Sequence, residues 1–116
     1  NSLHKQIYTL LKLEGNDIYK ENLMYLLFAY YDNNYMNLHN YNEALSIAKE
    51  NSIITDELYG NLSQKYIQTL IDQSYAYSDL FQYNSVIELS DSICILQERL
   101  TGNYSYHCKK FKYSFS

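Results

Sequence analysis

The sequence has no proline, no tryptophan and only three glycines among 116 residues. It therefore contains no Gly-, Ser- or Pro-rich stretch that would act as a flexible linker between domains. Hydrophobic residues make up 47% of the chain and charged residues 19%, a balance typical of a globular protein rather than a disordered one. Because this length suits one hydrophobic core, we expect residues 1–116 to form a single domain.

Basic residues are also scarce. The chain has nine Lys and Arg residues against 13 Asp and Glu residues, and Lys109, Lys110 and Lys112 lie in the last eight positions. Residues 1–108 therefore carry six basic and 13 acidic side chains, a formal charge of −7. This excess of negative charge argues against a phosphate-binding surface, so we expect no direct contact with nucleic acid.

Long apolar runs are missing as well. The longest is LMYLLFAYY, residues 23–31, which is roughly half of the ~20 residues that a membrane-spanning helix needs. The chain does not open on a charged segment followed by an apolar one, as a secretory leader would. We expect no membrane insertion.

Metal-binding and catalytic patterns are absent too. The sequence has no C-x2-C or H-x3-H spacing, and His107 and Cys108 are adjacent, so one helix would point them about 100° apart. His4 and His39 lie in other parts of the chain. No nucleophile and base are suitably spaced, and no glycine loop could cradle a phosphate. We expect no metal, no cofactor and no enzymatic activity.

All three glycines share one local sequence, Leu-x-Gly-Asn, at Leu13–Asn16, Leu58–Asn61 and Leu100–Asn103. The glycines are 45 and then 42 residues apart, which indicates an internal repeat. We divide the chain into a partial unit, two full units and a second partial unit: residues 1–15, 16–60, 61–102 and 103–116.

Apolar residues recur at helical spacing within these units. Tyr41, Ala44 and Ala48 follow the three- and four-residue spacing of one helical face, and the aligned residues 83–90 repeat it. The periodicity predicts about six helices, at residues 2–13, 17–31, 41–58, 62–78, 83–100 and 104–116.

Gly15, Gly60 and Gly102 each follow a predicted helix. Only glycine adopts the left-handed backbone of a helix C-cap without strain, and an asparagine after it can start the next helix by accepting a backbone N–H. Leu-x-Gly-Asn therefore predicts a helix stop followed by a helix start. We expect these three glycines to be the structural turns between units.

The two cysteines lie on either side of the last of these turns. Cys94 is eight residues before Gly102 and Cys108 is six residues after it, which places them at similar heights on two antiparallel helices. We interpret them as buried free thiols that fill gaps in the core, an interpretation that slightly favours the cytoplasm. A disulfide in an oxidising compartment is the alternative, and the localisation stays open.

Residues 70–86 resemble the signature of the tetratricopeptide repeat, in which a small residue, an aromatic, a turn, a second aromatic and a small residue follow at fixed intervals. The matching positions are Leu70, Ser74, Tyr77, Phe81, Tyr83 and Val86. Asn40–Leu45 is similar to the family's G-x-Y-x-x-A-L segment, and His39 and Phe81 stand where the family usually has glycine. The 42-residue period resembles the kinesin-light-chain subclass, which is also common in bacterial proteins.

The resemblance implies an all-α fold, an α-solenoid of antiparallel helix hairpins in which the first helix of each hairpin lines a concave groove. The groove residues that it implies are Glu21, Met24, Phe28, Tyr31 and Asp32 in one unit, and Gln68, Ile71, Tyr75, Ser78 and Asp79 in the next. Their aromatic rings offer contact area, and their polar groups could bond a peptide backbone or basic side chains. Alternatively, Phe28 and Tyr75 pack against neighbouring helices.

The connection inside the first hairpin, Tyr31–Asn40, is longer than Ser78–Gln82 in the second. Its residues 33–36 are a second candidate surface, or simply a tolerated loop. Apolar residues such as Leu3 and Phe115 near the chain ends lack a polar cap. We therefore expect a fragment of a longer array, or self-association through unpaired terminal helices.

Three functions fit these features. The leading hypothesis is a scaffold that binds a protein or peptide, such as a helical segment, in the concave groove. The second is a peptide-sensing or regulatory module of a larger signalling or transcription protein. The third is a structural spacer without a ligand.

Overall fold

The computed structural model describes residues 5–7, 9 and 17–102, and within these residues it contains helices and no strands. The elements are α2 (Asp17–Asp32), the π-helical turn η1 (Asn33–Asn37), α3 (Tyr41–Tyr59), α4 (Gln64–Asp79) and α5 (Tyr83–Thr101). The all-α prediction is confirmed, and the four predicted helices between residues 17 and 100 have ends within two residues of those observed. The helix predicted at 104–116 and the turn at Gly15 lie outside the described residues.

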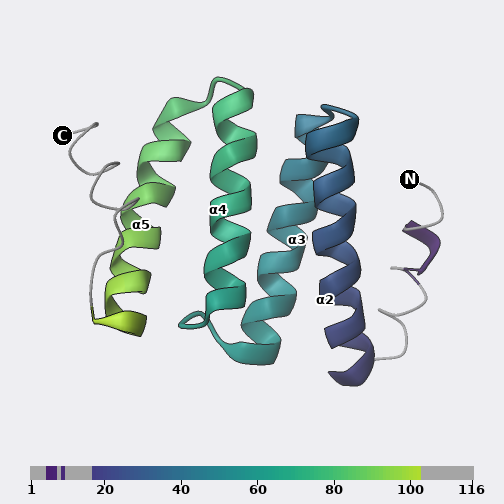
Figure 1. Cartoon of the computed structure of the whole chain (residues 1–116), viewed down its shortest axis with the longest axis horizontal. Helices are drawn as coiled ribbons and strands as arrows, with labels where there is room; N and C mark the ends of the chain where they lie inside the picture. The colour runs from purple at the N-terminus through teal and green to yellow at the C-terminus, as the bar shows by residue number, and fades with distance from the viewer. Residues whose placement is uncertain (1–4, 8, 10–16, 103–116) are drawn as a thin grey trace.

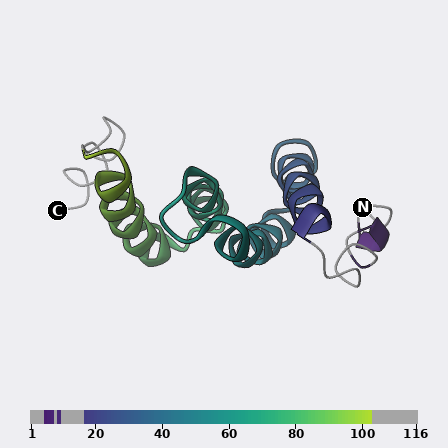
Figure 2. The same ribbon diagram turned by 90° about the horizontal axis from the view of Figure 1, so that it is seen from below.

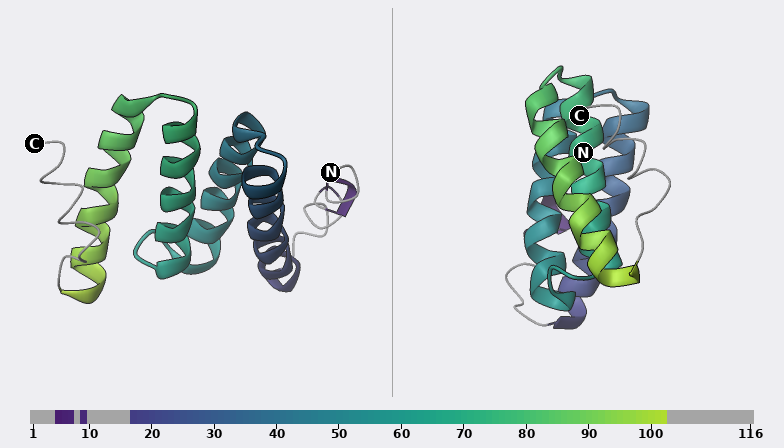
Figure 3. Two further views of the ribbon diagram at one scale, coloured as in Figure 1. Left: turned by 45° about the horizontal axis from the view of Figure 1, so that its top comes forward. Right: turned by 90° about the vertical axis from the view of Figure 1, so that its left-hand side faces the viewer.

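Each helix packs against the next one along the chain, α2 on α3, α3 on α4 and α4 on α5 (Figure 1). Seen from below, α2 and α4 lie towards one side of the row, while α3 and α5 lie towards the other (Figure 2). The left view of Figure 3 shows helices α2 to α5 side by side, and the order of the colours shows that successive helices alternate in direction. Helices α2 and α4 therefore run in the same direction and share one side of the molecule.

Two hydrophobic clusters form the core, the α2–α3 core and the α4–α5 core. The α2–α3 core contains the buried residues Leu23, Met24, Leu27, Tyr30, Tyr31, Ala44, Ile47, Ala48 and Ile54. The α4–α5 core contains Ile67, Leu70 and Ile93. Leu23 and Leu70, which the repeat aligns with each other, are both buried. Apolar residues three and four positions apart thus turn one face of each helix inward.

The chain turns between the two helices of each hairpin through a residue with a left-handed backbone. These residues are His39, with φ 53°, and Phe81, with φ 62°. Both stand where the tetratricopeptide family usually has glycine. A non-glycine residue in this left-handed region has a conformational free energy about 1–2 kcal/mol higher than in the ordinary regions. Both hairpins therefore contain a strained turn at the same place.

The glycine turns between hairpins only partly follow the prediction. Gly102 ends α5 in the predicted left-handed conformation, at φ 80° and ψ −3°. Gly60 ends α3 with φ 83° but ψ 167°, a different region that is also reserved for glycine. Helix α4 starts at Ser63, whose Oγ accepts from the N–H of Tyr66 and donates to the carbonyl of Gly60. The expectation that Asn61 starts this helix is therefore wrong.

The longer connection of the first hairpin is not a loop. Its residues 33–37 extend α2 as the π-helical turn η1, in which the N–H of Leu38 donates to the carbonyl of Asn33 at 3.1 Å. Asn34 is buried, and its Nδ2 donates to the carbonyl of Tyr30 at 3.0 Å. The connection is therefore part of the packed structure rather than a tolerated insertion.

Cys94 is buried in α5 and disulfide-bonded. Its interpretation as a free thiol is therefore wrong, and the disulfide alternative applies to this residue. The second cysteine of the chain, Cys108, lies outside the described residues.

Phe81 provides a test of the strained turn. Because its side chain is 76% exposed, its replacement opens no cavity in the core. Phe81→Gly relieves the left-handed strain and Phe81→Ala keeps it. In urea unfolding we expect the glycine variant to be more stable than the alanine variant by about 1 kcal/mol, the reverse of their order inside helices. Equal stabilities, or a more stable alanine variant, would contradict the strained turn.

Candidate functional site

The ten residues predicted to line a groove differ in exposure. Glu21, Asp32, Gln68, Tyr75 and Ser78 are exposed. Phe28, Ile71 and Asp79 are partly buried. Met24 and Tyr31, by contrast, are 0% and 4% exposed and belong to the α2–α3 core instead of a groove surface.

Helices in a stack bury more than one face, which explains these differences. Phe28 packs against the α2–α3 core, in line with the alternative that it packs between helices. Ile71 packs against the α4–α5 core. Tyr75 remains 47% exposed. The aromatic part of the predicted groove is therefore open at Tyr75 and largely closed along α2.

Four tyrosines gather at the end of the molecule where α2 continues into η1, and we name Tyr31, Tyr35, Tyr41 and Tyr75 the tyrosine cluster. Tyr35 is its centre. Its ring stacks on Tyr31 with centroids 5.5 Å apart, meets Tyr41 edge-on at 5.3 Å and lies 6.4 Å from Tyr75. Such ring pairs stabilise by about 0.5–1.5 kcal/mol beyond the area they bury. The cluster joins α2, η1, α3 and α4.

Two hydrogen bonds tie this cluster to α4. The hydroxyl of Tyr35 donates to Oδ2 of Asp79, and the hydroxyl of Tyr31 donates to the backbone carbonyl of Asp72 at 2.6 Å. Burial is the main cause that raises the pKa of both tyrosine hydroxyls, and the bond to Asp79 adds to it for Tyr35. Both hydroxyls therefore stay protonated at neutral pH and act as donors.

The carboxyl group of Asp72 is also buried beside Tyr31 and is 8% exposed. Its Oδ1 accepts from Nε2 of Gln68 at 3.0 Å. Burial raises the pKa of Asp72 from 3.8 to about 6; the bond from Gln68 lowers it, and the nearby charge of Asp32 raises it further. The carboxyl group therefore changes between its protonated and charged forms near pH 6.

Tyr35 did not belong to the groove residues that the resemblance implied, and the π-helical turn explains why. The wider turn holds an extra residue, which shifts every later side chain away from the positions that a 3.6-residue period predicts. The amide of Asn34 compensates by bonding the carbonyl of Tyr30. The only sequence signal was the longer connection at residues 33–36.

The open part of this site combines ring faces and carboxylates, and we name Asp32, Tyr35, Tyr41, Tyr75 and Asp79 the tyrosine–aspartate surface. Asp32 and Tyr75 are exposed, and the other three are partly buried. Tyr41 also contacts His39, whose Nδ1 lies 3.2 Å from its hydroxyl. The surface offers flat apolar area together with negative charge.

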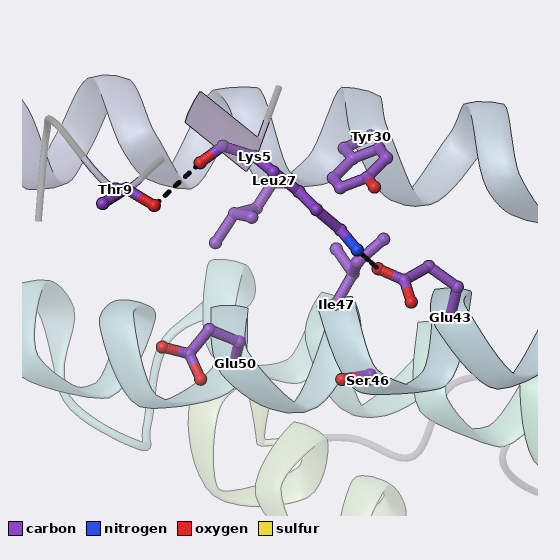
Figure 4. A pocket seen from close by; sticks show the side chains of 8 residues that line it. All are labelled: Lys5, Thr9, Leu27, Tyr30, Glu43, Ser46, Ile47 and Glu50. Carbon is purple, nitrogen blue, oxygen red and sulfur yellow. Dashed lines mark hydrogen bonds and ion pairs between the residues drawn. The ribbon is translucent and has the colours of Figure 1, made fainter. Parts of the chain in front are cut away.

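A separate cavity of about 300 Å³ lies at the other side of α2, between Lys5 and Thr9, α2 and α3 (Figure 4). Leu27 and Ile47 line it, and Lys5 reaches across to Glu43, with Nζ and Oε1 3.6 Å apart. A second cavity of about 520 Å³ lies between α4 and α5. Neither cavity contains a residue of the predicted groove.

The described residues hold no group of three or more His, Cys, Asp or Glu side chains that could bind a metal ion. No helix in the same part of the chain is long and apolar enough to cross a membrane. Comparisons with known protein families, characterised proteins and solved structures return no match. The tyrosine–aspartate surface is therefore the feature with the most distinctive chemistry.

Asp72 generates a prediction about pH. Asp72→Asn removes the buried charge and keeps an oxygen that can accept from Gln68. Because the folded-state pKa of Asp72, about 6, exceeds its ordinary value of 3.8, the stability that this proton contributes is present in acid and lost as pH rises from about 4 to 6. Between pH 4 and 7 we expect the free energy of unfolding of the parent to fall by up to about 3 kcal/mol relative to that of the variant, as measured by urea unfolding at each pH. A difference that is independent of pH would contradict the burial of this carboxyl group.

Proposed function

We propose that this protein is an interaction scaffold, built as an α-solenoid of tetratricopeptide-type hairpins, that binds a peptide or helical segment on the side shared by α2 and α4. The repeated hairpin supports the architecture. Helices pack in chain order, and His39 and Phe81 turn both hairpins with the backbone that glycine provides in that family. In such an array, the side shared by the first helices of neighbouring hairpins is the natural place for a partner.

The observation that carries the functional part is the tyrosine–aspartate surface. It draws side chains from two neighbouring hairpins, and ring contacts and the bond from Tyr35 to Asp79 hold it in place. A surface that is already ordered loses little conformational freedom when a partner binds. Tyrosines add contact area with a polar end, so they suit peptide recognition.

Polar residues beside this surface suit a peptide backbone. Asp32, Gln68 and Ser78 are exposed, and each is able to accept or donate a hydrogen bond. A peptide that lies across α2 and α4 would find ring faces to pack on and partners for its amides. No covalent chemistry is required.

Tyr75→Glu tests this proposal, with Tyr83→Glu as its control. Tyr83 is 52% exposed, close to the 47% of Tyr75, but it lies on α5 and belongs to neither the tyrosine cluster nor the α2–α4 side. In affinity capture from a lysate of the source organism, we expect proteins retained by the parent and by Tyr83→Glu to be recovered at least tenfold less with Tyr75→Glu, because the substitution removes the exposed ring on which the partner packs.

Circular dichroism of the three proteins is the folding control and should show equal helicity. If all three retain the same proteins, or if none retains any, the scaffold proposal fails and the structural spacer becomes the better account. Loss of helicity in Tyr75→Glu alone would mean that Tyr75 supports the core instead of a binding surface.

A further inference from the structure

No Lys or Arg of the described residues pairs with Asp32 or Asp79, or lies over the ring of Tyr35 or Tyr75. The sequence has no Lys or Arg between Lys20 and Lys49, nor between Lys65 and Arg99. These two stretches contain eight acidic residues, Glu21, Asp32, Glu43, Asp72, Asp79, Glu88, Asp91 and Glu98. They include η1, most of α2 and α4, the first half of α3 and nearly all of α5. Of these eight residues, Asp32 and Asp79 belong to the tyrosine–aspartate surface, which therefore carries negative charge.

The chain places two of its own lysines over the rings of other tyrosines. Nζ of Lys65 lies 4.9 Å from the ring centroid of Tyr25, and Nζ of Lys49 lies 5.4 Å from that of Tyr77. The negative face of an aromatic ring attracts a cation at such distances. Tyr25, which is exposed, and Tyr77, which is partly buried, thus receive cations within the fold.

The tyrosine–aspartate surface also has ring faces that could bind a cation, but no Lys or Arg of the described residues lies over them. The two remaining described lysines, Lys5 and Lys20, pair with Glu43 and Glu57. None lies over Tyr35 or Tyr75. The ring faces and carboxylates at this end are complementary to positive charge that must come from outside the described part of the chain.

Asp79 is oriented to receive that charge. Its Oδ2 accepts from the hydroxyl of Tyr35, and no hydrogen bond or ion pair within the described residues occupies its Oδ1. The ring of Tyr35, which this bond fixes, lies 6.4 Å from that of Tyr75 at an angle of 51°. A cation over Tyr75 would therefore meet a carboxylate that is already held in position.

We propose that the partner of this surface is a cationic segment of another protein, with an arginine side chain stacked on Tyr75 and paired with Asp79, and with further basic residues near Asp32. This inference rests on the proposed function and names the chemistry of its partner. Arginine suits the site better than lysine, because its planar guanidinium group both stacks on a ring and forms paired hydrogen bonds to a carboxylate.

The test uses defined probes and fluorescence anisotropy with the full chain. The probes are a labelled Gly/Ser peptide containing several arginines and the same peptide with glutamine in place of each arginine. We expect the arginine peptide to bind the parent at low salt, to bind more weakly as salt rises, and to bind at least tenfold more tightly than the glutamine peptide.

Variants of the surface test whether it binds the peptide through cation–ring contacts or only through apolar contact. Tyr75→Phe keeps the ring and should bind the arginine peptide within about twofold of the parent. Tyr75→Leu keeps apolar bulk without the ring face and should bind about five- to tenfold more weakly. Asp79→Asn should weaken binding by a similar factor, and Tyr83→Leu on α5 should leave it unchanged.

Three results would contradict the proposal of a cationic partner. They are equal binding of the arginine and glutamine peptides, no binding of either peptide, and equal affinities of Tyr75→Leu and the parent for the arginine peptide. These outcomes are distinguishable from failure of the scaffold. If Tyr75→Glu still loses proteins that the parent captures, the scaffold stands with a partner of different chemistry. If the parent captures nothing, the scaffold itself falls.

Discussion

Two tyrosine hydroxyls connect one helix hairpin to the next, and the candidate site depends on them. Tyr31 bonds the backbone of Asp72, and Tyr35 bonds the carboxylate of Asp79, so α2 and η1 are tied to α4. Each hairpin has its own hydrophobic core. These two bonds and the contact of α3 with α4 connect the two hairpins.

That connection also fixes the surface for which we propose a cationic partner. Tyr35 holds the hairpins together and lies beside the exposed ring of Tyr75 and the carboxylate of Asp79. Two other tyrosines, Tyr25 and Tyr77, receive the chain's own Lys65 and Lys49. No Lys or Arg of the described residues lies over Tyr35 or Tyr75.

Much of the helical framework followed from periodicity and glycine positions, whereas the site did not. The spacing of apolar residues located α2 to α5. His39 and Phe81 were noted only as departures from the family's glycine, and their left-handed backbone was not predicted. Periodicity shows that a face is buried, but not how many faces, so Tyr31 was assigned to a groove although it lies in the core. The π-helical turn that presents Tyr35 has no periodic signature, and the hydroxyl of Ser63 replaced Asn61 as the cap through a local bond.

The bond between Tyr35 and Asp79 is the most direct test of this account. The measurement is a double-mutant cycle on the free energy of unfolding in urea, with Tyr35→Phe, Asp79→Ala and the combined variant. We predict a coupling energy of about 1 kcal/mol, because the bond is charge-assisted but partly exposed to solvent. Additive effects of the two changes would contradict the claim that this bond ties the hairpins together and positions the surface.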